Sequence, residues 1–272
     1  MLLQIPFSLP PEIFTIGPLS VRWYGLCWAS GFAIGYFVMQ KIFRREGEDE
    51  AWLDWLLLIL VLCSVLGARL GHVFFYDLPA EPERYLSRPW EALMFWKGGM
   101  ASHGGFIGMI LAFFIFSKWV SKKPVLWGSD RVVLPTAITA GLIRVGNFFN
   151  QEIVGNFTDV PWAVQFVLRG ETMGRHPAQL YEAICYFAIA AFLFYLYFRQ
   201  DGGKKLGFLT GVFLSLTFTA RFLIEFLKPG QEAFEASILL NMGQWLSIPI
   251  VLFGLWLIWR SRKVADGNVV GS

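Results

Sequence analysis

The segment 141–155, GLIRVGNFFNQEIVG, carries charged and amide side chains inside an apolar run that begins near Val132. If this run crosses a bilayer, an arginine at its centre costs about 2.5–3.5 kcal/mol on insertion scales. Such residues are rare in spanning helices and usually face a polar interior or a ligand. At about 100° per residue, Arg144, Asn147 and Gln151 lie within about 60° of one another, which predicts one polar face on one helix.

The composition predicts an integral membrane protein. Of 272 residues, 56% are hydrophobic and only 16% are charged, whereas a soluble domain has about 25% charged residues. The net charge of +3 comes without a basic cluster interleaved with aromatic residues, so we expect no nucleic-acid partner. The three cysteines lie in apolar runs and are expected to be small buried hydrophobes. No Lys or Arg occurs in the first twenty residues, so a cleaved signal peptide is not expected.

Spanning helices need about 17–25 mainly apolar residues, and seven segments qualify. They are residues 20–40, 52–73, 100–119, 131–150, 177–198, 206–227 and 243–260. If the N-terminus lies outside, the inside connections hold thirteen basic residues and the outside connections six. Because basic residues favour the cytoplasmic side, we expect the N-terminus outside and the C-terminus inside. The predicted fold is an all-α polytopic membrane protein.

Residues 1–263 are predicted to form a single seven-helix transmembrane domain. The Trp-rich, amphipathic segment 74–99 is expected to be an interfacial arm. Glycine, proline and alternating apolar residues in 151–176 predict a small extracytoplasmic cap with short strands. Residues 264–272 are expected to be a flexible cytoplasmic tail.

The glycine-rich segment 98–108, GGMASHGGFIG, opens the third predicted span. Glycine permits a positive φ or a close approach of the backbone, and the positive end of a helix dipole here would bias His103 toward neutral imidazole. The histidine is therefore a candidate base, although an ordinary loop-to-helix turn with a hydrogen-bonded histidine remains the alternative.

Arginines in other spans are further candidates. Arg69 is followed at i+3 and i+7 by His72 and Tyr76, and it either serves a site or extends to the interface. Tyr24, in the cluster that begins the first span, is either a site residue or part of an interfacial aromatic belt.

The last arginine candidate lies in the sixth predicted span. Arg221 and Glu225 are spaced i,i+4 and could neutralise each other, but Arg144 and Arg221 together could also bind a phosphate. Gln179 and Glu182 are expected to face the bundle, and Gln244 is expected to make a packing hydrogen bond.

Several chemistries lack their sequence signals. The chain has no His-Glu-x-x-His motif, no Gly-x-Ser-x-Gly elbow and no phosphate loop. A transporter or channel for an anionic solute is the alternative function, but it predicts polar residues through the whole membrane depth, whereas the candidate residues approach the outer side. The absence of an internal repeat gives a duplicated transporter no support.

These residues form motifs that resemble the bacterial prolipoprotein diacylglyceryl transferase family over nearly the whole chain. The motifs are RWYG (22–25), GxRxG (67–71), SHGG (102–105), RxGNFxNxExxG (144–155), RHPxQLYE (175–182) and RFxxE (221–225). The fourth is highly specific for the family. One position departs from it, because Thr217 stands where the family often has tyrosine.

The resemblance implies an enzyme that transfers the sn-1,2-diacylglyceryl group of phosphatidylglycerol to the lipobox cysteine of a preprolipoprotein signal peptide, at the outer side of the bacterial inner membrane. It implies no metal and no cofactor. His103, Arg144 and Arg221 are then the expected catalytic residues. The expected phosphatidylglycerol-binding residues are Tyr24, Arg69, Gly104, Arg144, Asn147, Asn150, Glu152, Gly155, Arg221 and Glu225.

Overall fold

The computed structural model describes residues 4–17, 19–230 and 240–267. The chain divides into two compact units, one formed by residues 1–39 and 130–272 and the other by residues 40–129. The predicted single domain of residues 1–263 stays a prediction, and of the predicted tail, α9 includes 264–267 while 268–272 lie outside the described residues.

Seven helices of the described chain are long and apolar enough to cross a membrane, which confirms the seven predicted spans. Six of the segments contain α1 (Trp23–Glu46), α2 (Ala51–His72), α5 (Ser102–Ile115), α6 (Val125–Phe149), α7 (Ala178–Arg199) and α8 (Phe208–Glu225). The seventh contains α9 (Met242–Gly267). The predicted orientation in the membrane stays a prediction.

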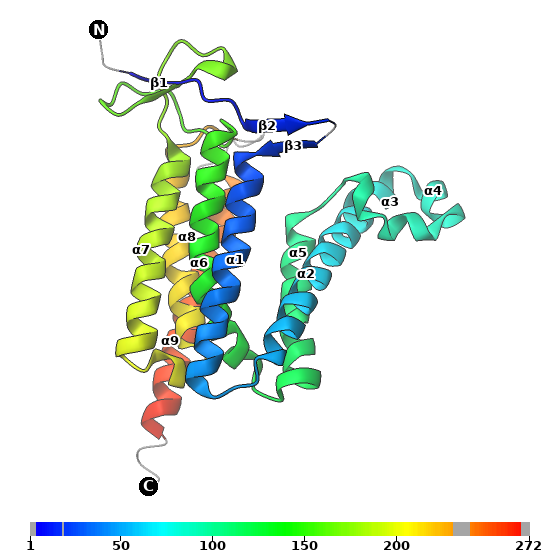
Figure 1. The fold of residues 1–272 in the computed structure, drawn as a ribbon, viewed down its shortest axis with the longest axis vertical. Helices are drawn as coiled ribbons and strands as arrows, with labels where there is room; N and C mark the ends of the chain where they lie inside the picture. Colours follow the sequence, from blue (N-terminus) through cyan, green and yellow to red (C-terminus); the bar gives the residue numbers. More distant parts are fainter. Residues whose placement is uncertain (1–3, 18, 231–239, 268–272) are drawn as a thin grey trace. The chain divides into compact units, whose positions relative to one another are not determined.

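The first unit is a helix bundle with short strands at one end (Figure 1). Helix α8 packs against α7 and α9. The hydroxyl of Thr139 in α6 donates to the carbonyl of Gly31 in α1 at 3.2 Å, which ties these two helices together. The strands lie where α6 ends and α7 begins.

The strands of the first unit form two small sheets. In one, β1 (Ile5–Phe7) pairs in parallel with β4 (Val164–Phe166). In the other, β2 (Glu12–Ile16) and β3 (Leu19–Arg22) form an antiparallel pair. The cap therefore has a strand as predicted, but its partner comes from the N-terminal segment, for which no strand was expected. A short 3-10 turn, η5 (Val167–Arg169), follows β4.

The second unit is built on the close packing of α2 against α5. A Cβ at Gly67 would lie 2.5 Å from the carbonyl oxygen of Gly104, and one at Gly71 would lie 2.7 Å from its Cα. Gly108 likewise faces the backbone of α2. Small residues four apart on both helices allow this approach, as in other membrane helix pairs. The glycines of segment 98–108 therefore serve helix packing as well as the preceding turn.

An irregular helical arm connects α2 to α5. Its elements are η1 (Val73–Asp77), α3 (Leu78–Ala80), α4 (Pro82–Ser87), η2 (Pro89–Leu93) and η3 (Phe95–Lys97). Several large apolar side chains of the arm are exposed, including Leu86, Trp90 and Trp96. Its predicted place in the membrane interface stays a prediction. At its other end, α5 continues into a π-helical segment, η4 (Phe116–Ser121).

In the first unit, a short 3-10 helix, η6 (Gly202–Lys204), precedes α8.

Candidate active site

The C-terminal end of α6 carries polar residues of segment 141–155. Arg144 Nη1 lies 3.4 Å from Oδ1 of Asn147, whose amide nitrogen donates to Glu152 Oε1 at 2.7 Å. The amide of Asn150 reaches the same oxygen at 3.2 Å. Arg144, Asn147 and Glu152 therefore form a continuous chain of polar contacts.

The expectation that Gln151 continues this helix face is wrong. Helix α6 ends at Phe149, and Gln151 adopts a left-handed φ of 54°. The helix stops because the backbone turns here into the cap, and Ile153 repeats the left-handed conformation with a φ of 56°. The side-chain amide of Gln151 is buried without a hydrogen-bond partner among the described residues.

A buried carboxylate on α7 faces Arg144. Glu182 has no solvent exposure, and its Oε2 lies 3.0 Å from Arg144 Nε. One turn later, Tyr186 is buried and lies within electrostatic range of both Arg144 and Arg221. The two arginines of the predicted phosphate site therefore share one neighbourhood. Gln179, also fully buried, donates to the carbonyl of Glu152 at 2.5 Å. Both α7 residues face the bundle as predicted.

The alternative that Glu225 neutralises Arg221 is not what the structure has. The partner of Glu225 is Lys228, whose Nζ lies 3.2 Å from Glu225 Oε2 and 2.9 Å from Glu182 Oε1. The lysine follows the end of α8 by one turn and can reach both carboxylates. Among the described residues, no carboxylate pairs with Arg221.

Two more predicted residues of the first unit pack closely against this region. A Cβ at Gly146, between Arg144 and Asn147, would lie 2.9 Å from the Tyr24 ring, so Tyr24 packs on α6 beside them. Gly155 lies where three backbone segments cross, and its Cβ would meet the carbonyl oxygens of His176 and Leu227 at 2.7 and 2.8 Å. This crowding requires glycine at 155 whatever its contact with lipid.

The cap is fastened by ion pairs. Glu171 lies 2.7 Å from Arg175 and 3.1 Å from Arg169. Burial alone would raise the pKa of Glu171, but hydrogen bonds from both arginines outweigh it and hold that pKa below its usual range. Arg175 also donates to the carbonyl of Gly155, and Arg169 to that of Gln151, so the cap is tied to the segment that leaves α6.

In the second unit, His103 is the second residue of α5. The turn before this helix uses positive φ angles of 87° and 70° at Gly98 and Gly99, as expected for glycine here. The His103 ring is exposed and lies against the rings of Phe75 and Tyr76, with centroids 5.0 and 6.1 Å away. No described residue hydrogen-bonds to it, so the alternative of a hydrogen-bonded histidine is not what the structure has.

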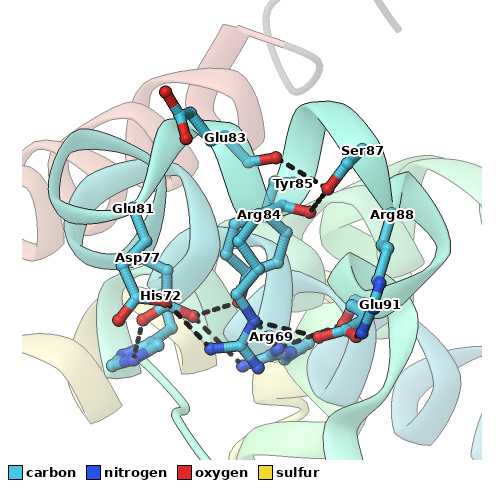
Figure 2. A network of polar contacts seen from close by, with 10 residues as sticks. All are labelled: Arg69, His72, Asp77, Glu81, Glu83, Arg84, Tyr85, Ser87, Arg88 and Glu91. Carbon is cyan, nitrogen blue, oxygen red and sulfur yellow. Dashed lines mark hydrogen bonds and ion pairs between the residues drawn. The ribbon is translucent and has the colours of Figure 1, made fainter.

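Arg69 is the centre of a polar network under the arm (Figure 2). Its guanidinium donates to the carbonyls of Gly98 at 2.8 Å and Glu91 at 3.1 Å, and to the Tyr85 hydroxyl at 3.3 Å. Tyr85 in turn donates to Asp77 at 2.6 Å. Because Arg69 is only 3% exposed, the alternative that it extends to the interface is wrong. Its guanidinium holds the arm and the glycine turn that leads to His103.

Residues that could bind a metal do not gather in the described part of the chain. It contains no group of three or more His, Cys, Asp or Glu side chains with that potential. The three cysteines are free thiols.

Comparison with known families decides the relationship of this chain. The family model described as prolipoprotein diacylglyceryl transferase matches residues 11–260. The chain belongs to the prolipoprotein diacylglyceryl transferase family. Among its relatives are proteins named phosphatidylglycerol–prolipoprotein diacylglyceryl transferase. The one from Tolumonas auensis is 48% identical over 94% of this chain and 97% of its own length. The one from Chloroherpeton thalassium is 44% identical over 96% and 95%, respectively.

Two neighbours of the arginines, Lys228 and Tyr186, are not among the site residues that the sequence predicts. The sequence predicts Lys228 only as one of the basic residues of the outside connections, because it lies beyond the apolar run of residues 206–227. A signal was available, because Lys228 follows Glu225 at i+3 and such pairs meet on one helix face. Tyr186 follows Glu182 at i+4 in α7, which gives the same kind of signal. Gln244 makes its predicted packing contact, donating to Phe222 at 3.3 Å.

Proposed function

We propose that this chain transfers the sn-1,2-diacylglyceryl group of phosphatidylglycerol to the lipobox cysteine of a preprolipoprotein. The thiolate attacks the glyceryl carbon that carries the phosphate, a C–S bond forms, and the C–O bond to phosphate breaks. The electron pair of that bond leaves with glycerol phosphate, and the thiol proton goes to a base. The reaction is balanced without an oxidant, a metal or an organic cofactor.

The observation that carries this proposal is the arginine cluster, Arg144 and Arg221, in a chain that belongs to this family. The leaving group becomes more anionic as the C–O bond breaks, because a phosphate monoester carries more negative charge than a diester. Preorganised cations aimed at developing charge are an effective way to lower such a barrier. Arg144 and Arg221, which share the neighbourhood of Tyr186, are the groups that we assign to the phosphate.

Other residues of the first unit are assigned to orientation. The side-chain amides of Asn147 and Asn150 both donate to Glu152, and these three residues would orient the glycerol or brace Arg144. Tyr24, Gly155 and Glu225 complete the predicted head-group residues of this unit. The contacts of Gly155 and Glu225 with their own neighbours make them supports of that site.

We assign His103 as the base for the thiol proton. A free cysteine has a pKa near 8.5, so it is mostly protonated at neutral pH, and only the thiolate is a strong nucleophile. The imidazole is exposed at the start of α5 without a hydrogen-bond partner among the described residues, which leaves a ring nitrogen able to accept a proton. Arg69 and Gly104 are the predicted binding residues of the same unit.

The setting of the reaction is part of the proposal. Phosphatidylglycerol and the signal peptide of the precursor would be the partners, in the bacterial inner membrane, with the site toward the outer side. The basic residues of the predicted inside connections support this orientation.

The test supplies phosphatidylglycerol, labelled in the glycerol backbone of its diacylglyceryl group, and a lipobox peptide to the purified chain in mixed micelles. We expect label on the peptide through a thioether, which resists alkaline hydrolysis of esters, and release of glycerol phosphate in equal amount. A peptide with serine in place of cysteine is the control. Passage of glycerol phosphate across vesicles without peptide labelling would support the transport alternative instead.

A further inference from the structure

We infer that Lys228 is a positioning residue, which holds Glu182 and Glu225 and so keeps the guanidinium of Arg221 available to an anionic lipid head group. This inference rests on the proposed function, because it assigns the phosphate of the lipid to the arginine cluster. It concerns a residue that lies outside the sequence motifs of the family resemblance.

The geometry of Lys228 is that of a buried bridge. Its side chain is 5% exposed, and those of Glu182 and Glu225 are 0% and 2% exposed. Its ammonium lies 2.9 Å from one carboxylate and 3.2 Å from the other. An ammonium has three donors and no acceptor, so one lysine can satisfy both. A buried charge is costly unless it is paired in this way.

The charges of the cluster explain why this bridge matters. Arg144, Arg221 and Lys228 supply three positive charges, and Glu182 and Glu225 supply two negative ones. The next carboxylate, Glu152, is hydrogen-bonded to the amides of Asn147 and Asn150 and to no cation among the described residues. These five residues together thus have one positive charge in excess. Phosphatidylglycerol carries one negative charge, which would balance it.

Without Lys228, the same residues would neutralise themselves. Two arginines would face two carboxylates, and Glu225 stands at i,i+4 to Arg221, a spacing at which opposite charges meet on a helix. Glu225 would then compete with the phosphate for Arg221. Because Lys228 pairs with Glu225, the guanidinium of Arg221 stays available to an external anion.

The backbone around Lys228 fixes this arrangement. The amide of Lys228 donates to the carbonyl of Glu225 at 3.1 Å, and the carbonyl of Leu227 accepts from Asn156 of the cap at 2.7 Å. On the other side, a Cβ at Gly243 would lie 2.9 Å from the Glu225 carboxylate. The start of α9 therefore packs directly against Glu225 while Lys228 holds its charge.

The test uses the full chain in mixed micelles that contain phosphatidylglycerol or phosphatidylcholine. The variants are Lys228→Met, Lys228→Arg and the double variant Lys228→Met/Glu225→Gln, which restores the excess positive charge. We expect Lys228→Met to raise the KM for phosphatidylglycerol about tenfold with a smaller change in kcat, as for a lost binding interaction. The double variant should recover to within about threefold of the original KM, and Lys228→Arg should retain it.

A second readout needs no turnover. Phosphatidylglycerol retained by the purified chain is compared with retained phosphatidylcholine by native mass spectrometry. Lys228→Met should lose the preference for the anionic lipid, and the double variant should regain it. The matched control is the exposed pair of Lys204 and Asp201, which lie 3.0 Å apart. Lys204→Met and Lys204→Met/Asp201→Asn should leave KM and lipid preference unchanged.

Each outcome decides the inference. Equal loss in the single and double variants, or unchanged KM and lipid preference in Lys228→Met, would overturn it. If Lys228→Met does not fold, the double variant decides, since restored folding and lipid preference support the bridge and failure to fold contradicts it. Lipid retention without any peptide labelling by the unmodified chain would overturn the proposed function and leave the retention test of Lys228 valid.

Discussion

Nε of Arg144 lies 3.0 Å from Oε2 of Glu182, a carboxylate that is completely shielded from solvent. The pair joins α6 to α7 at Arg144, the first polar residue of segment 141–155. The buried carboxylate and the half-buried guanidinium are tolerated because Lys228 pairs with the other carboxylate oxygen at 2.9 Å and Asn147 contacts the guanidinium. An arginine that is costly to insert is thus fixed in place by its neighbours.

Glu182→Gln should destabilise the first unit and impair transfer. Breaking a buried ion pair by removing one partner costs about 3–5 kcal/mol, because the other charge remains buried. Here two cations, Arg144 and Lys228, would lose their shared carboxylate. Thermal unfolding in detergent and kcat/KM measure the two effects, and Glu171→Gln in the cap provides a comparison outside the bundle. An unchanged melting temperature would contradict a structural role for this pair.

Arg144→Lys should lower kcat/KM by about 100-fold, because an ammonium is a point charge and cannot replace the two-pronged guanidinium. The lysine keeps the charge, so lipid preference should fall less than turnover. Steady-state kinetics with phosphatidylglycerol and a lipobox peptide give the value. Near-normal turnover would mean that Arg144 is needed for structure alone.

His103→Ala should abolish transfer with little change in expression, because the side chain is exposed and its ring lies against those of Phe75 and Tyr76. The comparison is His72→Ala, which removes an imidazole paired with Asp77 at 3.1 Å and should retain measurable transfer. A peptide already activated as its thiolate at high pH should partly rescue the His103 variant. Retained activity at neutral pH would remove His103 as the base.

Gly104→Ala should destabilise the second unit, whereas Gly105→Ala should not. A Cβ at 104 would clash with the Gly67 carbonyl and lie 2.8 Å from the Gly71 Cα, whereas one at 105 has its nearest contact at 3.5 Å. Overpacking of this kind costs about 1–3 kcal/mol. Thermal unfolding compares the two variants. If Gly104→Ala loses lipid binding but keeps full stability, then the glycine is needed for the substrate and not for helix packing.

The cap should loosen in acid through Glu171. Hydrogen bonds from Arg175 and Arg169 hold its folded-state pKa below the usual value, so its stabilising effect is complete above the unfolded pKa of about 4.3. That effect is lost as the pH falls through the lowered pKa. The hydrogen-exchange protection factors of residues 155–175, which correct for the intrinsic pH dependence of exchange, should therefore fall with acidification below about pH 4. Glu171→Gln should show faster exchange at neutral pH and less change on acidification, and equal pH dependence in both proteins would contradict this.

The apolar runs alone determined the seven spans. Their length and hydropathy are properties of the sequence, and a helix satisfies its own backbone hydrogen bonds in lipid without help from other segments. The same local physics gave the glycine turn at Gly98 and Gly99 and the start of the helix that carries His103. The arginines were predicted for a similar reason, since a charged residue in an apolar run can be recognised from the sequence without knowing its contacts.

Tertiary structure alone decided how those charges are paired. The i,i+4 spacing places Glu225 beside Arg221, but in the structure the carboxylate of Glu225 pairs with Lys228. The same ammonium lies 2.9 Å from Glu182 of α7, a contact between distant segments of the chain. The strand partner of Val164–Phe166 comes from residues 5–7, more than 150 positions away in the sequence. Gly104 proved to be a packing contact because α2 crosses α5 there. Pairing between distant segments depends on which of them fold together, and local sequence patterns do not carry that information.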